Sequence, residues 1–383
     1  MWRILFLLPS WILFAEASAV YLSWYGDPST TMTIQWLSSV EELGDKVVFE
    51  DADGNWLEAS GQHVNLEQIL VHTVALEGLA PDREYQFKIV DDSRMYRFKT
   101  APDQLNEPLR FVIGGDVYLS KKLFRKMGQT VMKRDPLFAV LGGDLAYALS
   151  RHPFQGSPLR RWISFLNEWK ETMITPEGRI VPFLVVPGNH DIATDNYELF
   201  FNLFAFPQKQ LYRAIDFGSY MTLLLLDTGH FQPIEGRQTL WLEKALSTRT
   251  ATPYRFAVYH EAAYPSHYPY QGVTPKKIRA HWIPLFEKYN LLAAFENHNH
   301  AFKRTYSIKA GQIAPSGDSG VIYLGDGGWG AQPRTTNDLW YLAKRSRKAT
   351  VLWIEMQDTE THVEALDLAN QAIDQITLYP NNK

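Results

Sequence analysis

The chain has 383 residues, of which 45% are hydrophobic and 21% are charged, and its formal net charge is -4. This is the composition of an ordinary globular protein with enough apolar material for two or three domains. The small negative charge provides no basic field for nucleic acid or an acidic membrane surface, so we expect no nucleic-acid binding. The absence of cysteine excludes disulfides, thiolate chemistry and cysteine-ligated metals.

The N-terminus has the features of a targeting signal. Arg3 precedes the apolar run Ile4–Phe14, and Ala17-Ser18-Ala19 has the small-x-small form of a cleavage site. The run is too short to span a bilayer. We therefore predict a signal peptide over residues 1–19, cleaved after Ala19, a secreted or periplasmic location, and no integral membrane association of the mature chain. The alternative is an uncleaved membrane anchor.

The region from residue 20 to residue 101 is predicted to be an all-β domain. Val20–Trp24 and Met32–Trp36 follow the period-two pattern of strands, and turn residues separate the predicted strands. Short strands at regular spacing favour a β-sandwich. Leu76–Phe87 is similar to the end-of-domain pattern of fibronectin type III domains, in which Tyr85 would pack near a strand corner.

After a polar linker, residues 109–383 show strands that alternate with helices. The predicted strands are Arg110–Ile113, Leu137–Leu141, Val181–Val186, Met221–Leu226, Arg255–Tyr259, Leu291–Phe295, Gly320–Leu324, Thr350–Glu355 and His362–Asp367. Amphipathic helices are predicted over Lys121–Arg134, Leu159–Met173, Thr194–Phe204, Gly236–Leu246 and Lys276–Tyr289. Continuous apolar strands flanked by helices favour an α/β core.

Five of these strands end in side chains that can bind metals. They are followed by Gly114-Gly115-Asp116, Gly142-Gly143-Asp144 with Tyr147, Gly188-Asn189-His190-Asp191, His260, and His298-Asn299-His300. Since sites in open α/β sheets form beyond the carboxyl ends of the strands, we expect these side chains to share one rim. Carboxylates, imidazoles and an amide oxygen suit iron, zinc or manganese. About seven ligands are too many for one tetrahedral zinc, and two metals bridged by a carboxylate fit better.

These five segments resemble, in order, the five motifs of the calcineurin-like metallophosphoesterases, and the position of Tyr147 marks the purple acid phosphatase branch. The resemblance implies a four-layer α/β/β/α sandwich preceded by a small fibronectin type III-like domain. It also implies a phosphoric ester hydrolase. The expected function is hydrolysis of phosphate monoesters, of the acid phosphatase type, by a hydroxide at a dinuclear metal centre. The substrate would be a small phosphate ester or a phosphoprotein.

The resemblance also implies a role for each residue that matches a motif. The first metal, expected to be Fe(III), would be held by Asp116, Asp144, Tyr147 and His300. The second, a divalent iron, zinc or manganese ion, would be held by Asp144, Asn189, His260 and His298. Asp144 would bridge the two ions. A phenolate prefers a hard trivalent cation, which is the reason to expect Fe(III) beside Tyr147. Alternatively, Tyr147 is a packed aromatic, and the preference for Fe(III) is lost.

The leaving group would be protonated by a histidine, for which His190 and His267 are the candidates. Two alternative functions stay open: a phosphodiesterase or nucleotide pyrophosphatase that uses the same dinuclear site, and a non-catalytic envelope binding protein.

Two positions depart from the family pattern, because Tyr118 and Asn297 stand where glycine is usual. We expect Asn297 to adopt a left-handed conformation and Tyr118 to narrow the pocket or contact substrate. Asp191 is expected to orient a neighbouring imidazole or to cap the following helix. Asp227 and His230 are expected to have structural or supporting roles on the same rim.

Overall fold

The computed structural model describes residues 17–39, 44–67, 69–90, 92–149, 157–192, 197–204, 206, 210–315, 320–325 and 327–381. Most of the predicted signal peptide, residues 1–16, lies outside these ranges. Ser18 and Ala19 open strand β1 (Ser18–Ser23), and the Ala19 amide donates to Oδ1 of Asn167 at 3.0 Å. Cleavage after Ala19 would remove these two strand residues, and its position stays a prediction. In the described part of the chain, no helix has both the length and the apolar composition needed to cross a bilayer.

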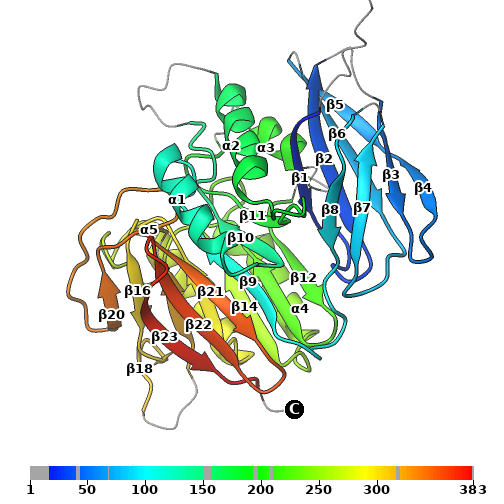
Figure 1. Cartoon of the computed structure of the whole chain (residues 1–383). Coiled ribbons are helices and arrows are strands. Elements are labelled where there is room, and N and C mark those ends of the chain that lie inside the picture. Colours follow the sequence, from blue (N-terminus) through cyan, green and yellow to red (C-terminus); the bar gives the residue numbers. More distant parts are fainter. Residues whose placement is uncertain are drawn as a thin grey trace, which may run out of the picture.

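The N-terminal domain consists of two four-stranded antiparallel sheets, at the right of Figure 1. The first has the order β1-β2-β6-β5, with β2 (Met32–Ser39), β5 (Gln62–Leu66) and β6 (Ile69–Leu76). The second has the order β4-β3-β7-β8, with β3 (Lys46–Glu50), β4 (Trp56–Ser60), β7 (Glu84–Ile89) and β8 (Tyr96–Lys99). Tyr85 is buried, and its hydroxyl accepts a hydrogen bond from the Ala80 amide at 2.7 Å, which confirms its packing at a strand corner.

The C-terminal region contains two larger sheets. One has the order β11-β10-β9-β21-β22-β23, with β9 (Leu109–Gly114), β10 (Phe138–Gly142), β11 (Phe183–Val186), β21 (Thr350–Met356), β22 (Thr361–Asp367) and β23 (Ala372–Leu378). The other has the order β12-β13-β14-β15-β19-β16-β20, with β12 (Arg213–Phe217), β13 (Met221–Leu225), β14 (Tyr254–Val258), β15 (Ala293–Glu296), β16 (Phe302–Thr305), β19 (Ile322–Gly325) and β20 (Leu342–Ser346). A small hairpin joins β17 (Ile308–Lys309) and β18 (Gln312–Ile313). Strands β9, β10 and β11 are parallel, as are β13, β14, β15 and β19.

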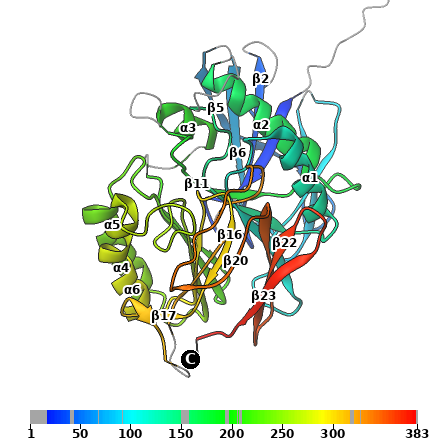
Figure 2. The same ribbon diagram turned by 90° about the vertical axis from the view of Figure 1, so that its left-hand side faces the viewer.

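The two sheets pack against each other, and helices cover their outer faces. Phe111 and Phe138 stack at 4.6 Å and share one apolar cluster with Phe256 of the opposite sheet. Helices α1 (Lys121–Met132), α2 (Pro158–Thr172) and α3 (Tyr197–Phe204) pack on the outer face of the first sheet. Helices α4 (Thr239–Ser247), α5 (Val273–His281) and α6 (Ile283–Lys288) cover the second sheet, and Figure 2 shows them together on one side of the molecule. The predicted four-layer α/β/β/α fold is therefore confirmed.

Two predicted helices differ from the observed ones for local reasons. The single helix expected over Lys276–Tyr289 is two helices, α5 and α6. Pro284 has no amide hydrogen and its ring excludes the carbonyl one turn earlier, so one helix does not continue through it. The helix expected from Gly236 begins instead at Thr239, after the π-helical turn η2 (Ile234–Gln238), because Gly236 has a φ of 81°.

Candidate metal centre

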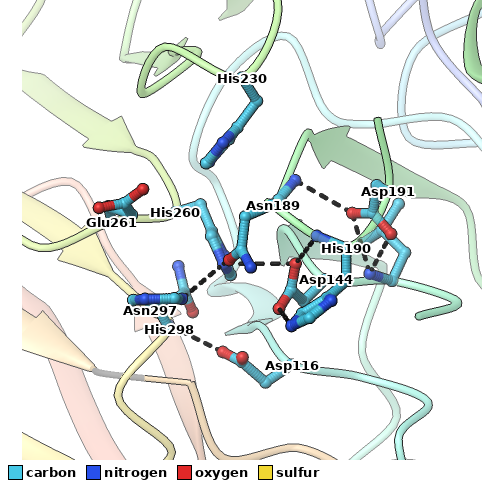
Figure 3. Close-up of polar contacts among 12 residues, drawn as sticks. Asp116, Asp144, Asn189, His190, Asp191, His230, His260, Glu261, Asn297 and His298 are labelled. Carbon is cyan, nitrogen blue, oxygen red and sulfur yellow. Dashed lines mark hydrogen bonds and ion pairs between the residues drawn. The ribbon is translucent and has the colours of Figure 1, made fainter. Parts of the chain in front are cut away.

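The seven predicted ligands lie at the carboxyl ends of five strands. Asp116 follows β9, Asp144 and Tyr147 follow β10, Asn189 follows β11, His260 follows β14, and His298 and His300 follow β15. Because the two sheets face each other, these loops meet at one edge of the sandwich. Figure 3 shows side chains from all five loops pointing toward one another.

Five of the seven side chains are attached to backbone in the left-handed region. The φ values are 55° for Asp116, 51° for Asp144, 55° for Tyr147, 77° for His298 and 53° for His300. Such conformations cost on the order of 1–3 kcal/mol each for residues with a Cβ and persist only where the surrounding structure imposes them. The fold therefore accepts local strain in order to direct these side chains inward.

One group of ligand atoms surrounds the imidazole of His260. Its Nδ1 lies 2.8 Å from the carbonyl oxygen of Gly142 and therefore donates to it, which leaves Nε2 as the inward-facing atom. Three atoms with lone pairs approach this Nε2: Asn189 Oδ1 at 3.1 Å, His298 Nδ1 at 3.2 Å and Asp144 Oδ1 at 3.4 Å. A single proton on Nε2 satisfies only one of these three contacts. A cation between the four atoms would interact favourably with the lone pairs of all of them. The donor set of this group thus fits a metal ion.

A second group of ligand atoms surrounds Asp116. Its Oδ1 accepts a hydrogen bond from the Tyr147 hydroxyl at 2.9 Å and lies 2.8 Å from Nε2 of His300. The Tyr147 oxygen and the same His300 nitrogen are 3.1 Å apart. The other oxygen of Asp116 accepts the amide of His298 at 2.8 Å, which connects this group to the first. A carboxylate, a phenol and an imidazole therefore converge beside the His260 group.

The electrostatics of the centre favour positive charge. Burial alone would lower the pKa of His260, but the Asp144 carboxylate beside it raises that pKa to about 10. Burial would raise the pKa of Asp116, yet His300 and His260 hold it below its ordinary value. Burial lowers the pKa of His298 to about 3, so that ring stays neutral and able to bind a metal.

Glycines allow the loops to approach this closely. Gly143 has a φ of 88°. A Cβ on Gly188 would lie 2.1 Å from the Asp144 amide nitrogen, and one on Gly327 would lie 1.7 Å from an Asp116 carboxylate oxygen. The glycines of the Gly-Gly-Asp and Gly-Asn-His turns therefore leave the space in which the candidate ligands approach one another.

Asp191 has a role in addition to the two that were predicted. Whether it caps the following helix concerns residues 193–196, which lie outside the described ranges. Its carboxylate accepts the Leu145 amide at 2.9 and 3.0 Å and the Gly188 amide at 3.0 Å, as Figure 3 shows in part. Asp191 thus ties the loop after β10 to the loop after β11.

Asp227 performs a similar function on the neighbouring loop after β13. It accepts the backbone amides of residues 229, 230, 231 and 232 at 2.6–3.1 Å. This loop presents His230, whose ring lies edge-on to His260 at 5.6 Å between centroids. Burial lowers the pKa of His230 to about 3, so it is a neutral ring beside the centre.

Neither departure from the motif pattern acts as expected. Asn297 is not left-handed, and the turn uses His298 instead. The Asn297 side chain donates to the carbonyl of Tyr259 at 2.9 Å and occupies the space beside Gly142, where a Cβ would lie 1.9 Å from it. Tyr118 is fully buried, packs edge-on against Phe124 and contacts Ser164 of α2 at 3.0 Å, so it belongs to the core beneath the helices.

The two candidate catalytic histidines lie at different depths. The backbone amide of His190 donates to Asp144 Oδ1 at 2.8 Å, its ring stacks on Tyr147, and its Nε2 lies 4.0 Å from Asp144 Oδ2. His267 is further out: its Nδ1 lies 2.8 Å from the carbonyl of Thr335, and its ring packs edge-on against Tyr268. His190 thus contacts the candidate ligands directly. The Tyr268 ring lies between His267 and the candidate ligand His298.

Tyr268 and Arg334 are site residues that the sequence did not identify. Tyr268 stacks on His298 with 4.8 Å between ring centroids. The Arg334 guanidinium lies over the Tyr268 ring, 5.3 Å from its centroid, and donates to the Tyr268 hydroxyl. The Arg334 amide also donates to the His300 carbonyl at 2.8 Å, which fixes this cation next to the centre. Tyr268 and Arg334 lie 66 residues apart in the sequence, so no local pattern indicates their contact.

Comparison with known proteins agrees with this geometry. The family model of the purple acid phosphatase N-terminal domain matches residues 17–100, and that of the calcineurin-like phosphoesterases matches residues 109–302. Purple acid phosphatase 23 of Arabidopsis thaliana is 25% identical over 347 residues, covering 79% of this chain and 72% of that protein. Purple acid phosphatase 13 of the same plant is 24% identical over 315 residues, covering 70% of this chain and 56% of that protein.

A solved structure shares the fold. Purple acid phosphatase PPD1 from yellow lupin (Lupinus luteus) seeds superposes with a TM-score of 0.80 at 16% identity, covering 95% of this chain and 74% of that chain. The second family model covers just over half of the present sequence. The chain therefore belongs to the calcineurin-like phosphoesterase family, as a phosphoric ester hydrolase of the purple acid phosphatase type.

Proposed function

We propose that this phosphoesterase hydrolyses phosphate monoesters, as an acid phosphatase, at a dinuclear metal centre. The observation that carries the proposal is the convergence of two groups of ligand atoms, around His260 and around Asp116, from five separate strand ends. Seven such atoms in contact exceed what one tetrahedral ion uses. The substrate would be a small phosphate ester or a phosphoprotein.

We assign the ions by the chemistry of each group. Asp116, Tyr147 and His300 would hold Fe(III), because a phenolate ligand favours a hard trivalent cation. Asn189, His260 and His298 would hold a divalent iron, zinc or manganese ion, and Asp144 would serve both. When bound, the two ions supply Lewis acidity to the phosphoryl group and to a water nucleophile.

The side chains around the centre supply the remaining functions. His190 is held by its backbone bond to Asp144 and by stacking on Tyr147, while its side chain stays 38% exposed. This position suits a proton donor to the leaving oxygen of a substrate that approaches from solvent. Arg334 places a permanent positive charge above Tyr268, which offsets the charge of a phosphate dianion. His267 is the second candidate donor.

Spectroscopy and substrate comparison test the proposal. The purified protein should contain two metals, show a visible iron–tyrosinate band, and release phosphate from p-nitrophenyl phosphate faster than it cleaves bis-p-nitrophenyl phosphate. Tyr147→Phe should lose the band and keep two metals. Tyr268→Phe, which removes a hydroxyl one ring away, should keep the band. Iron-loaded protein without colour would overturn the Fe(III) assignment, and a preference for the bis-ester would favour a phosphodiesterase.

We also propose that the protein is exported as a secreted or periplasmic enzyme. Sequencing the N-terminus of the exported protein should give Val20 as the first residue. A different first residue would overturn the predicted cleavage position, and retention of the full N-terminus in a membrane fraction would favour the uncleaved anchor.

A further inference from the structure

A second cluster of metal-binding side chains lies in the N-terminal domain, on strands separate from the loops of the catalytic centre. It consists of Asp45, directly before β3, His63 on β5 and His72 on β6. His63 and His72 are direct cross-strand partners in the first sheet. Asp45 leads into the opposite sheet, so the cluster joins the two sheets of the sandwich, whose strands β3, β5 and β6 are labelled in Figure 1.

The three side chains converge on one point. Nδ1 of His72 lies 2.6 Å from Asp45 Oδ1, and Nδ1 of His63 lies 2.8 and 2.9 Å from the two oxygens of the same carboxylate. One ligand atom from each residue lies within 4.8 Å of the others. Two imidazoles and a carboxylate at this spacing form a three-ligand set of the kind that binds zinc and related divalent ions.

His72 is held so that its Nδ1 faces the carboxylate. Its ring is fully buried and stacks on Trp36 with 4.7 Å between centroids and 1° between planes. Its Nε2 lies 2.7 Å from Oγ of Ser38, and that hydroxyl donates to the carbonyl of Ser39 at 3.0 Å. With the hydroxyl proton used in this way, the serine oxygen accepts from Nε2–H of His72. In the metal-free protein a proton lies between Nδ1 and the Asp45 carboxylate. Loss of that proton leaves the Nδ1 lone pair with which metal-binding histidines that have such a partner coordinate.

The position of Asp45 is also set by the backbone. Its carbonyl accepts the amide of Gly61 at 2.7 Å, which ties the start of β3 to the turn between β4 and β5. The open side of the cluster faces solvent, because the side chain of Asp45 is 26% exposed and that of His63 is 45% exposed. Water therefore has access to a fourth coordination position.

We propose that Asp45, His63 and His72 bind one divalent transition-metal ion of the zinc class, in addition to the metals of the catalytic centre. The ion takes the place of the protons that lie between the two Nδ1 atoms and the Asp45 carboxylate, and water completes a tetrahedral site. Because its ligands come from both sheets, the ion stabilises the N-terminal sandwich against unfolding by mass action. It lies outside the catalytic centre and takes no part in phosphate ester hydrolysis.

Metal content of the full chain tests this proposal. Protein with a filled catalytic centre is equilibrated with zinc, separated from free metal and analysed for metal per chain. The wild type should hold one equivalent of metal more than His63→Ala and Asp45→Asn. Loss of a residue that only hydrogen-bonds to a metal ligand lowers metal affinity roughly 10–100-fold, and the zinc affinity of these two variants should fall by more than that. Hydrolytic activity should be the same in all three. His362→Ala is the matched control, since His362 is 43% exposed and pairs with Glu360 at 2.9 Å on another sheet.

Two further readouts separate a metal site from a metal-free hydrogen-bond network. Added zinc should raise the melting temperature of the wild type and His362→Ala but not that of His63→Ala. Cobalt in place of zinc should give a d–d absorption band of a tetrahedral site that His63→Ala lacks. Equal metal content and equal zinc-induced shifts in wild type and His63→Ala, with activity retained, would overturn the proposal and leave a hydrogen-bonded Asp–His–His network.

Discussion

Replacing Asp191 with asparagine perturbs the two loops that carry Asp144 and Asn189 without altering a proposed ligand. The Asp191 carboxylate is buried and accepts the amides of Leu145 and Gly188, each adjacent to a ligand residue. In asparagine, the amide oxygen can take the place of Oδ2 and keep the 3.0 Å contacts to both amides. The NH₂ group then takes the place of Oδ1. There it faces the Leu145 amide nitrogen at about the present Oδ1 distance, and because both groups are donors they repel each other.

The cost of this change follows from the contacts. One hydrogen bond is lost and a buried amide meets a second donor, so Asp191→Asn should lower the free energy of unfolding by about 1–3 kcal/mol. The displaced loops should also weaken metal binding by about 10–100-fold, as the loss of other supporting groups does. Urea denaturation of the metal-free protein measures the first effect, and competition with a chelator measures the second.

Asp227→Asn provides the control. That carboxylate accepts four backbone amides of its own loop, so its replacement should cost comparable stability. Its bonds do not join two ligand-bearing loops, and metal affinity should stay within a few-fold of the wild type. If Asp191→Asn and Asp227→Asn lost stability equally and both kept wild-type metal affinity, the positioning role of Asp191 would be refuted.

Two further predictions concern sterics and pH. Gly188→Ala should reduce hydrolysis at least about 100-fold in a steady-state assay, because its Cβ would lie 2.1 and 2.2 Å from two atoms of Asp144 and the loop has to shift; full activity would contradict the steric argument. The Glu168 carboxylate lies 2.6 Å from Arg125 and 3.0 Å from Lys121. Burial alone would raise the pKa of Glu168, but these two cations hold it below its ordinary value. Its stabilisation, about 1–2 kcal/mol, is complete above the unfolded pKa of about 4.3 and is lost as the pH falls through the lower folded value. The stability difference between wild type and Glu168→Gln should therefore be constant near neutrality and vanish in acid, and a difference independent of pH in denaturation curves would count against the ion pairs.

The position of the candidate ligands at strand ends was predictable because each motif combines a strand, a turn and a metal-competent side chain within a few residues. Gly143 and Gly188 signal a close backbone approach, and Asp144 follows at the position that the turn directs inward. These requirements act over short sequence distances, so the sequence carries them directly. For the same reason Tyr85, within a local pattern, was placed correctly at its strand corner.

The contacts that the sequence did not indicate depend on partners far away in the sequence. Tyr118 packs against α2 and not into the site, because its hydroxyl finds Ser164. Asn297 fills the space that Gly142 leaves open. Asp191 finds amide donors in a loop 46 residues earlier, at Leu145. None of these partners is indicated by spacing along the chain.

The sequence by itself determined the fold class, the family and the candidate ligands of the catalytic centre, because strand periodicity and turn chemistry are local. The tertiary structure decided which of these side chains meet, since the two sheets bring together strand ends as distant as Asp116 and His298. It also placed Tyr268 on His298, and Asp45 between His63 and His72. Those contacts arise from the packing of one sheet against another, which depends on the whole apolar core and is not encoded by any single segment.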